Sequence, residues 1–99
     1  MVQIKHSENE NSGLFEAWVT GDAGELVQAG EMTYRRTASE RMLIDHTFTF
    51  SGFEGQGIAR LMVMAAVAFA RENNRKIMPV CSYARAVLTR TDEYKDILA

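Results

Sequence analysis

Residues 41–60, RMLIDHTFTFSGFEGQGIAR, decide the expected fold because a strand, a turn and a helix start follow one another there. Apolar and polar positions alternate first, which predicts a strand over Arg41 to Phe50. One face of this strand is expected to carry Met42, Ile44, His46, Phe48 and Phe50. Ser51 to Gly57 contains three glycines and predicts a turn. A helix is expected from Ile58 to about Asn73, since apolar residues recur at helical spacing. Its expected apolar stripe is Ile58, Leu61, Met62, Ala65 and Phe69.

The residues before this stretch predict three more strands, joined by short polar or glycine-containing turns. The expected strands are Val2 to Ser7, Leu14 to Thr20 and Leu26 to Arg36. The expected connections are Glu8 to Gly13, Gly21 to Gly24 and Thr37 to Glu40. Short connections between consecutive strands predict an antiparallel meander.

The residues after the long helix predict a fifth strand over Lys76 to Cys81. A helix between two strands of one sheet implies a right-handed crossover, so strands four and five are expected to be parallel. Ser82 to Thr89 is expected to form a short helix with Ser82 as its N-cap, and Asp92 to Leu98 a further helical turn or two. The prediction is an α+β fold, a single mixed sheet in the order β-β-β-β-α-β-α, as one domain over residues 1–99.

Composition excludes several classes of protein. The chain has 99 residues and a formal net charge of −2, with no run of Lys and Arg, which disfavours nucleic acid as the partner. Leu61 to Ala70 is the longest apolar run, well short of the roughly 20 residues of a membrane span. A lone Cys81 favours a reducing, cytoplasmic setting. Cys81, His46 and His6 lack the paired spacings of zinc sites, so no metal is expected.

The glycine-rich turn suggests an anion site. The first turn of a helix leaves backbone N–H groups without partners, and glycines let a ligand come close to the backbone. A plain strand-to-helix turn explains the spacing equally well. The P-loop pattern is absent because Ile58 and Ala59 follow Gly57, and the dinucleotide pattern fails at Arg60.

Taken together, several motifs resemble the short, single-domain branch of the GNAT superfamily of N-acetyltransferases. They are His46-Thr47-x-Thr49, Phe53-Glu54-Gly55-Gln56-Gly57-Ile58-Ala59, Lys76-Ile77-x-Pro79-x-Cys81-Ser82-Tyr83 and Glu93-Tyr94-x-Asp96. The resemblance covers about residues 41 to 96. In the superfamily the loop reads Q/R-x-x-G-x-G/A, and Glu54 departs from it at the first position.

The resemblance implies that acetyl-CoA is the cosubstrate. Strands four and five would splay apart to admit the pantetheine arm, and Pro79 fits this because proline is disfavoured in a fully paired central strand. The residues expected at the cosubstrate are Phe50, Gln56, Gly57, Ile58, Ala59, Arg60, Ser82 and Tyr83. Backbone amides from Gln56 to Arg60 would hold the pyrophosphate.

The resemblance also implies a chemical role for Cys81, at the end of strand five, as the nucleophile that accepts the acetyl group. A helix N-terminus favours a thiolate, and Cys81 directly precedes the expected second helix. His46 is the candidate base. Direct attack by the amine on bound acetyl-CoA stays open, as do packing roles for both residues.

Two other classes of function stay open at this point. One is a non-catalytic acyl-CoA-binding or regulatory module, and the other is a small interaction domain without a cofactor. The acceptor amine is not identified by the sequence, and either a monomer or a homodimer is compatible with it.

Overall fold

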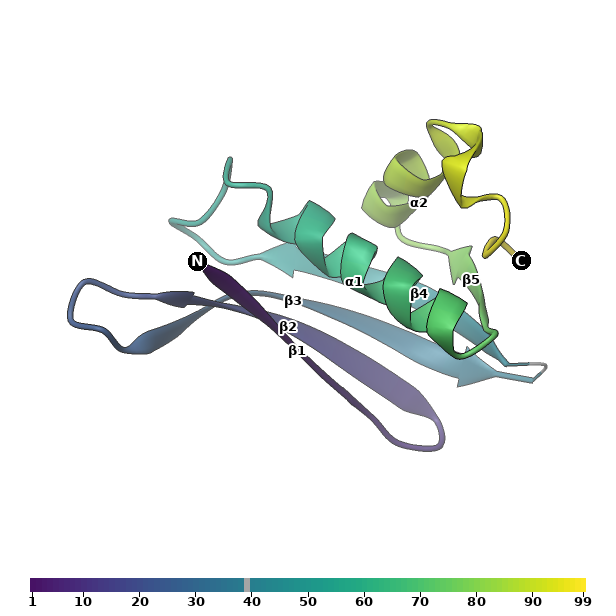
Figure 1. Cartoon of the computed structure of the whole chain (residues 1–99), viewed down its shortest axis with the longest axis horizontal. Helices are drawn as coiled ribbons and strands as arrows, with labels where there is room; N and C mark the ends of the chain where they lie inside the picture. Colours follow the sequence, from purple (N-terminus) through teal and green to yellow (C-terminus); the bar gives the residue numbers. More distant parts are fainter. Residues whose placement is uncertain (39) are drawn as a thin grey trace.

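The computed structural model describes residues 1–38 and 40–99, and its helices lie on one side of one five-stranded sheet (Figure 1). The strands are β1 (Val2–Glu8), β2 (Ser12–Thr20), β3 (Leu26–Thr37), β4 (Arg41–Thr49) and β5 (Lys76–Pro79). The helices are α1 (Ile58–Glu72), α2 (Ser82–Thr89) and a 3₁₀ turn, η1 (Asp92–Tyr94). The strands lie in sequence order, with β1 to β4 antiparallel and β4 parallel to β5. The predicted fold class is confirmed. The predicted connection Thr37 to Glu40 includes Ser39, which lies outside the described residues.

The core lies between the sheet and α1. Its largest fully buried side chains include Tyr34, Phe15 and Met32 from the strands. Gly13 leaves room for Tyr34, because a Cβ at that position would lie 2.0 Å from the Tyr34 ring. The buried residues of α1 are Ile58, Met62, Val63, Ala66, Val67 and Ala70. The predicted stripe was therefore partly wrong, since Leu61 is 42% exposed and Ala65 and Phe69 are only partly buried.

A β-bulge in β4 changes which side chains face the core. Thr33 pairs with His46 and Tyr34 pairs with Ile44, so Asp45 has no partner in β3. An extra residue reverses the alternation beyond it. Ile44 is consequently buried, whereas His46 and Phe48 are exposed on the opposite face. The prediction that these three residues share one face was wrong.

The sheet opens between β4 and β5 after four paired residues. The last pair is Ile44 with Pro79, and the amides of Val80 and Cys81 both donate to the Ile44 carbonyl, at 2.9 and 3.0 Å. Proline cannot donate to a ladder, and the chain turns away there. The prediction that β5 continues to Cys81 was wrong, but the predicted splay is confirmed: among residues 1–38 and 40–99, β4 has no strand partner on this side from Asp45 to Thr49.

The C-terminal segment lies along the other edge of β5. Only Asp92–Tyr94 is helical, in place of the longer turn expected up to Leu98. Leu98 instead forms a parallel bridge with Ile77, whose amide donates to Ile97 O at 2.6 Å. In the described part of the chain, no helix has the length and apolar character that crossing a bilayer would need.

A polar network joins the end of β1 and strand β3 to Arg75, which lies just after the C-terminal end of α1. The Arg75 guanidinium donates two hydrogen bonds to the Glu8 carboxylate, at 2.8 and 2.9 Å. Tyr34 OH donates to Glu8 at 2.8 Å and lies 2.7 Å from His6 Nε2. Burial raises the pKa of Glu8, but the hydrogen bonds from Arg75 and Tyr34 and the nearby Arg36 outweigh it and lower that pKa overall. Burial also lowers the pKa of His6.

Candidate functional site

Cys81 is the N-cap of α2, where its sulfur has two hydrogen-bond partners. The Ala84 amide donates to Cys81 Sγ at 3.4 Å, and Thr47 Oγ1 lies 3.3 Å from the same sulfur. Its extended backbone, with φ −70° and ψ 143°, is typical of an N-cap. Ser82 is the first residue of the helix, so the prediction that Ser82 caps it was wrong. The sulfur therefore lies at the start of α2, in contact with both a backbone amide of that helix and a side chain of β4.

Thr47 reaches Cys81 because of the bulge at Asp45. The bulge turns Thr47 and Thr49 to the face that carries α1, and it turns His46 to the other face. The His46 ring stacks against Phe48, with 6.0 Å between ring centroids. The structure therefore places Thr47 in contact with the sulfur, and no hydrogen bond joins His46 to Cys81 within the described residues. The contact of Thr47 with Cys81 was not predicted from the sequence, because the apolar–polar alternation of residues 41–50 contains no sign of the bulge.

The first turn of α1 presents free backbone donors. Gly57 is the N-cap, with φ 74°, and no side chain caps the helix. The first bond to the cap runs from the Leu61 amide to Gly57 O at 3.1 Å, which leaves the amides of Ile58, Ala59 and Arg60 without a protein acceptor in the described part of the chain. A Cβ built on Gly57 or Gly55 would meet no atom within 4 Å. The helix start thus has both the donors and the open space for an anion.

The Glu54 side chain forms a hydrogen bond within the glycine loop. Its Oε1 accepts a hydrogen bond from the Gly52 amide at 2.9 Å, and Phe53 N donates to Phe50 O at 3.1 Å. The carboxylate therefore closes a turn before the helix start. The departure of Glu54 from the expected Gln or Arg leaves the amides from Ile58 to Arg60 unaffected.

The other predicted site residues lie either at the start of α1 or at the start of α2 beside Cys81. Gln56 is exposed and Phe50 partly buried beside the α1 start, whereas Ser82 and Tyr83 are exposed at the α2 start. The Ile58 side chain belongs to the core, so only its amide is available. Strand β4 joins the groups, because Thr47 contacts Cys81 and the strand ends two residues later, just before the glycine loop.

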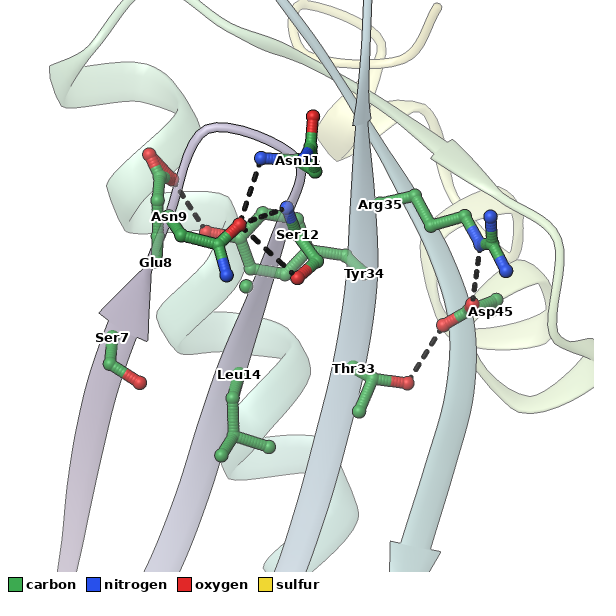
Figure 2. Close-up of a pocket in the computed structure, with 11 residues that line it drawn as sticks. Ser7, Glu8, Asn9, Asn11, Ser12, Leu14, Thr33, Tyr34, Arg35 and Asp45 are labelled. Carbon is green, nitrogen blue, oxygen red and sulfur yellow. Dashed lines mark hydrogen bonds and ion pairs between the residues drawn. The ribbon is translucent and has the colours of Figure 1, made fainter.

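A wide hollow of the surface lies elsewhere. It measures about 790 Å³ and is formed around the β1–β2 turn and the neighbouring parts of β3 and β4 (Figure 2). Several of its polar groups are paired: Asn9 accepts from the amides of Asn11 and Ser12, and Asp45 binds Thr33 and Arg35. None of the predicted site residues lines it. The charges of Arg35 and Asp45 neutralise each other in this hollow, and the candidate site around Cys81 lies outside it.

Comparisons with known proteins bear on the same region. A family model described as GCN5-related N-acetyl-transferase matches residues 15–97. A GCN5-like putative N-acetyltransferase from Staphylococcus aureus, solved by NMR, is 33% identical, with a TM-score of 0.69 over 98% of this chain and 87% of that one. A nourseothricin acetyltransferase is 24% identical, with a TM-score of 0.56, and matches 81% of this chain but 48% of its own, which supports the fold alone. The search of curated proteins gave no significant match.

Proposed function

Since the chain belongs to the GCN5-related N-acetyltransferase family, we propose that it transfers an acetyl group from acetyl-CoA to an amine through a thioester on Cys81. The observation that carries the proposal is the position of the sulfur, which caps α2 and lies 3.3 Å from Thr47 Oγ1. The sulfur accepts a hydrogen bond from the Ala84 amide and lies where β4 and β5 separate, so a thioester bound in that opening would meet the nucleophile.

The residues present fit acetyl-CoA as a substrate. The backbone amides of Gln56 to Arg60 would hold the pyrophosphate at the start of α1, where those of Ile58 to Arg60 have no acceptor among the described residues. The unpaired edge of β4, from Asp45 to Thr49, would bind the pantetheine amides by main-chain hydrogen bonds. Phe50 would pack against this arm, and Ser82 and Tyr83 would border the acetyl group beside Cys81.

The reaction divides into two steps. The Cys81 thiolate attacks the carbonyl carbon of the thioester; the new C–S bond forms as the bond to the CoA sulfur breaks, and the CoA thiolate leaves with a proton from solvent. The neutral amine then attacks the acetyl-cysteine, which forms the amide bond and releases the Cys81 thiolate. The proton lost by the amine goes to a base.

We propose His46 as that base. Its ring is exposed on the face of β4 opposite to Thr47, which a second substrate could approach without displacing the first. Its role therefore concerns the amine, not the activation of Cys81.

The proposed chemistry also favours one cellular compartment. A mechanism that needs a free thiol suits the reducing cytoplasm, and Cys81 has no disulfide partner, being the single cysteine of the sequence. We propose that residues 1–99 act as one domain, as a monomer or a homodimer. β1 and the C-terminal segment support this, because both join the sheet that carries Cys81.

Intact-mass spectrometry tests the proposal. The wild-type chain, mixed with acetyl-CoA, should gain one acetyl group, and Cys81→Ala should gain none. Adding an amine from a panel of small amines, peptides and lysine-containing peptides should remove the label from the wild type. Equal labelling of the two chains, or no labelling of either, would overturn the covalent route.

A further inference from the structure

A second, smaller hollow lies between the start of α1 and the end of α2. It measures about 340 Å³ and is lined by Arg60, Val87, Arg90, Thr91, Glu93 and Tyr94. Arg60 is the third residue of α1 and Arg90 directly follows α2. The hollow therefore lies beside the helix turn whose amides Ile58, Ala59 and Arg60 are free.

The two arginines of this hollow differ from most others in the chain. Four arginines form ion pairs with carboxylates, namely Arg35, Arg36, Arg71 and Arg75. Arg60 and Arg90 are exposed, and neither has a hydrogen-bond or ion-pair partner in residues 1–38 and 40–99. Two unpaired guanidinium groups at the rim of one concave surface attract an anion.

The two arginines of the hollow suit a phosphate monoester. A guanidinium presents a planar set of donors that matches phosphate oxygens, and a monoester carries nearly two negative charges at neutral pH. The volume admits a small group and not a folded peptide segment. A carboxylate, Glu93, lies at the rim and opposes the anion; its amide is already bonded to Thr91 Oγ1 at 3.2 Å.

We propose that this hollow binds the 3′-phosphate of the CoA ribose, an inference that rests on the function proposed above. CoA carries a diphosphate and a separate phosphate monoester, and the chain offers a diphosphate site at the α1 amides with a second cationic site next to it. Arg60 and Arg90 therefore set a preference for CoA over its 3′-dephospho form. Glu93 limits the strength of that preference.

Calorimetric titration of the full chain with CoA and with 3′-dephospho-CoA tests the inference. The wild type should bind CoA about tenfold more tightly, since two charged hydrogen bonds at an exposed site are each worth roughly threefold in affinity. Arg90→Gln should lose most of this preference and keep its affinity for dephospho-CoA. Arg41→Gln removes an exposed arginine at the start of β4 and should keep the preference. Glu93→Gln should enlarge it.

Three outcomes would contradict the inference, and they are distinguishable. Equal binding of both compounds by the wild type overturns the inference alone, whereas binding of neither overturns the proposed function as well. An equal loss of both affinities in Arg90→Gln would mean that Arg90 does not read the 3′-phosphate. Inorganic phosphate is a further probe: saturation at micromolar concentration would assign the hollow to free phosphate instead of CoA.

Discussion

Thr47 Oγ1 lies 3.3 Å from Cys81 Sγ, and the contact joins β4 to the N-cap of α2, beyond the point where β4 and β5 cease to pair. β4 and β5 share their last pair at Ile44 and Pro79, so the contact spans the opening of the sheet. It exists because the bulge at Asp45 shifts the alternation of β4 by one residue. The main catalytic proposal rests on this geometry.

Thr47→Val should slow acetylation of Cys81 about tenfold, because valine keeps the shape of threonine and removes one donor to the thiolate. The measurement is the time course of the acetyl mass shift at a fixed acetyl-CoA concentration. Thr47→Ser retains the hydroxyl and should stay close to the wild type. If valine and serine behave alike, the hydroxyl has no role in activating the sulfur.

His46→Gln should separate the two steps of the reaction. Acetylation of Cys81 should proceed at the wild-type rate, because His46 faces away from the sulfur. Transfer from acetyl-cysteine to an amine should slow, roughly a hundredfold for the loss of a general base. Decay of the acetyl label after addition of amine measures this step. A slower first step in the variant would place His46 at Cys81 after all.

Gly57→Ala should weaken both stability and CoA binding. Gly57 has φ 74°, and an L-residue in that conformation costs about 1–2 kcal/mol of unfolding free energy. The added methyl group would also stand at the anion site. Gly24→Ala is the matched control, with φ 85° and open space at the β2–β3 turn. Both variants should unfold at similarly lower urea concentrations, and only Gly57→Ala should lose CoA affinity; loss in both would argue against the helix start as the anion site.

Glu8→Gln should lower the unfolding free energy by about 2 kcal/mol, because the mostly buried Arg75 would lose its mostly buried carboxylate partner and keep only Glu40, whose side chain is 62% exposed. The Arg75 side chain is 11% exposed, whereas Arg71 and Asp96 pair at the surface with 44% and 55% exposed. Asp96→Asn should therefore change stability little. Urea unfolding of the two variants measures the difference, and equal effects would mean that the Glu8 network carries no special weight.

The same network should make the fold sensitive to acid. The pKa of Glu8 is lowered in the folded chain, so its stabilisation is complete above the ordinary glutamate pKa of about 4.3 and is lost as the pH falls through the folded value. The pKa of His6 is also lowered, chiefly by burial, so protonation of His6 acts in the same direction at higher pH. The unfolding free energy should fall from pH 7 to pH 3, and less steeply in Glu8→Gln. If the unfolding free energy falls equally steeply with pH in the wild type and in Glu8→Gln, Glu8 is not a source of the acid sensitivity.

The sequence predicted the elements well because periodicity and turn residues are local signals. The strand ends agree within a few residues, and the crossover from β4 through α1 to β5 follows from one helix between two strands. The glycine loop before α1 was also predictable, since Gly57 is needed where φ is positive.

The features that position the site came from long-range pairing. The bulge at Asp45 is set by the register with β3, and the alternating letters from Met42 to Phe50 contain no sign of it. The early end of β5 depends on the hydrogen bonds that the amides of Val80 and Cys81 donate to the Ile44 carbonyl. The bond between Glu8 and Arg75 joins positions 67 apart in the chain. The buried face of α1 likewise depends on how the helix is rotated against the sheet, which left Leu61 exposed.

The central claim is that a CoA thioester binds between the first turn of α1 and Cys81. The most direct test is a two-dimensional ¹H–¹⁵N NMR titration of the labelled chain with CoA. We predict the largest shifts at the amides of Gly57 to Arg60, along Asp45 to Thr49 and at Cys81. Shifts confined to the hollow at Ser12, Thr33 and Arg35, or no shifts at all, would contradict the account.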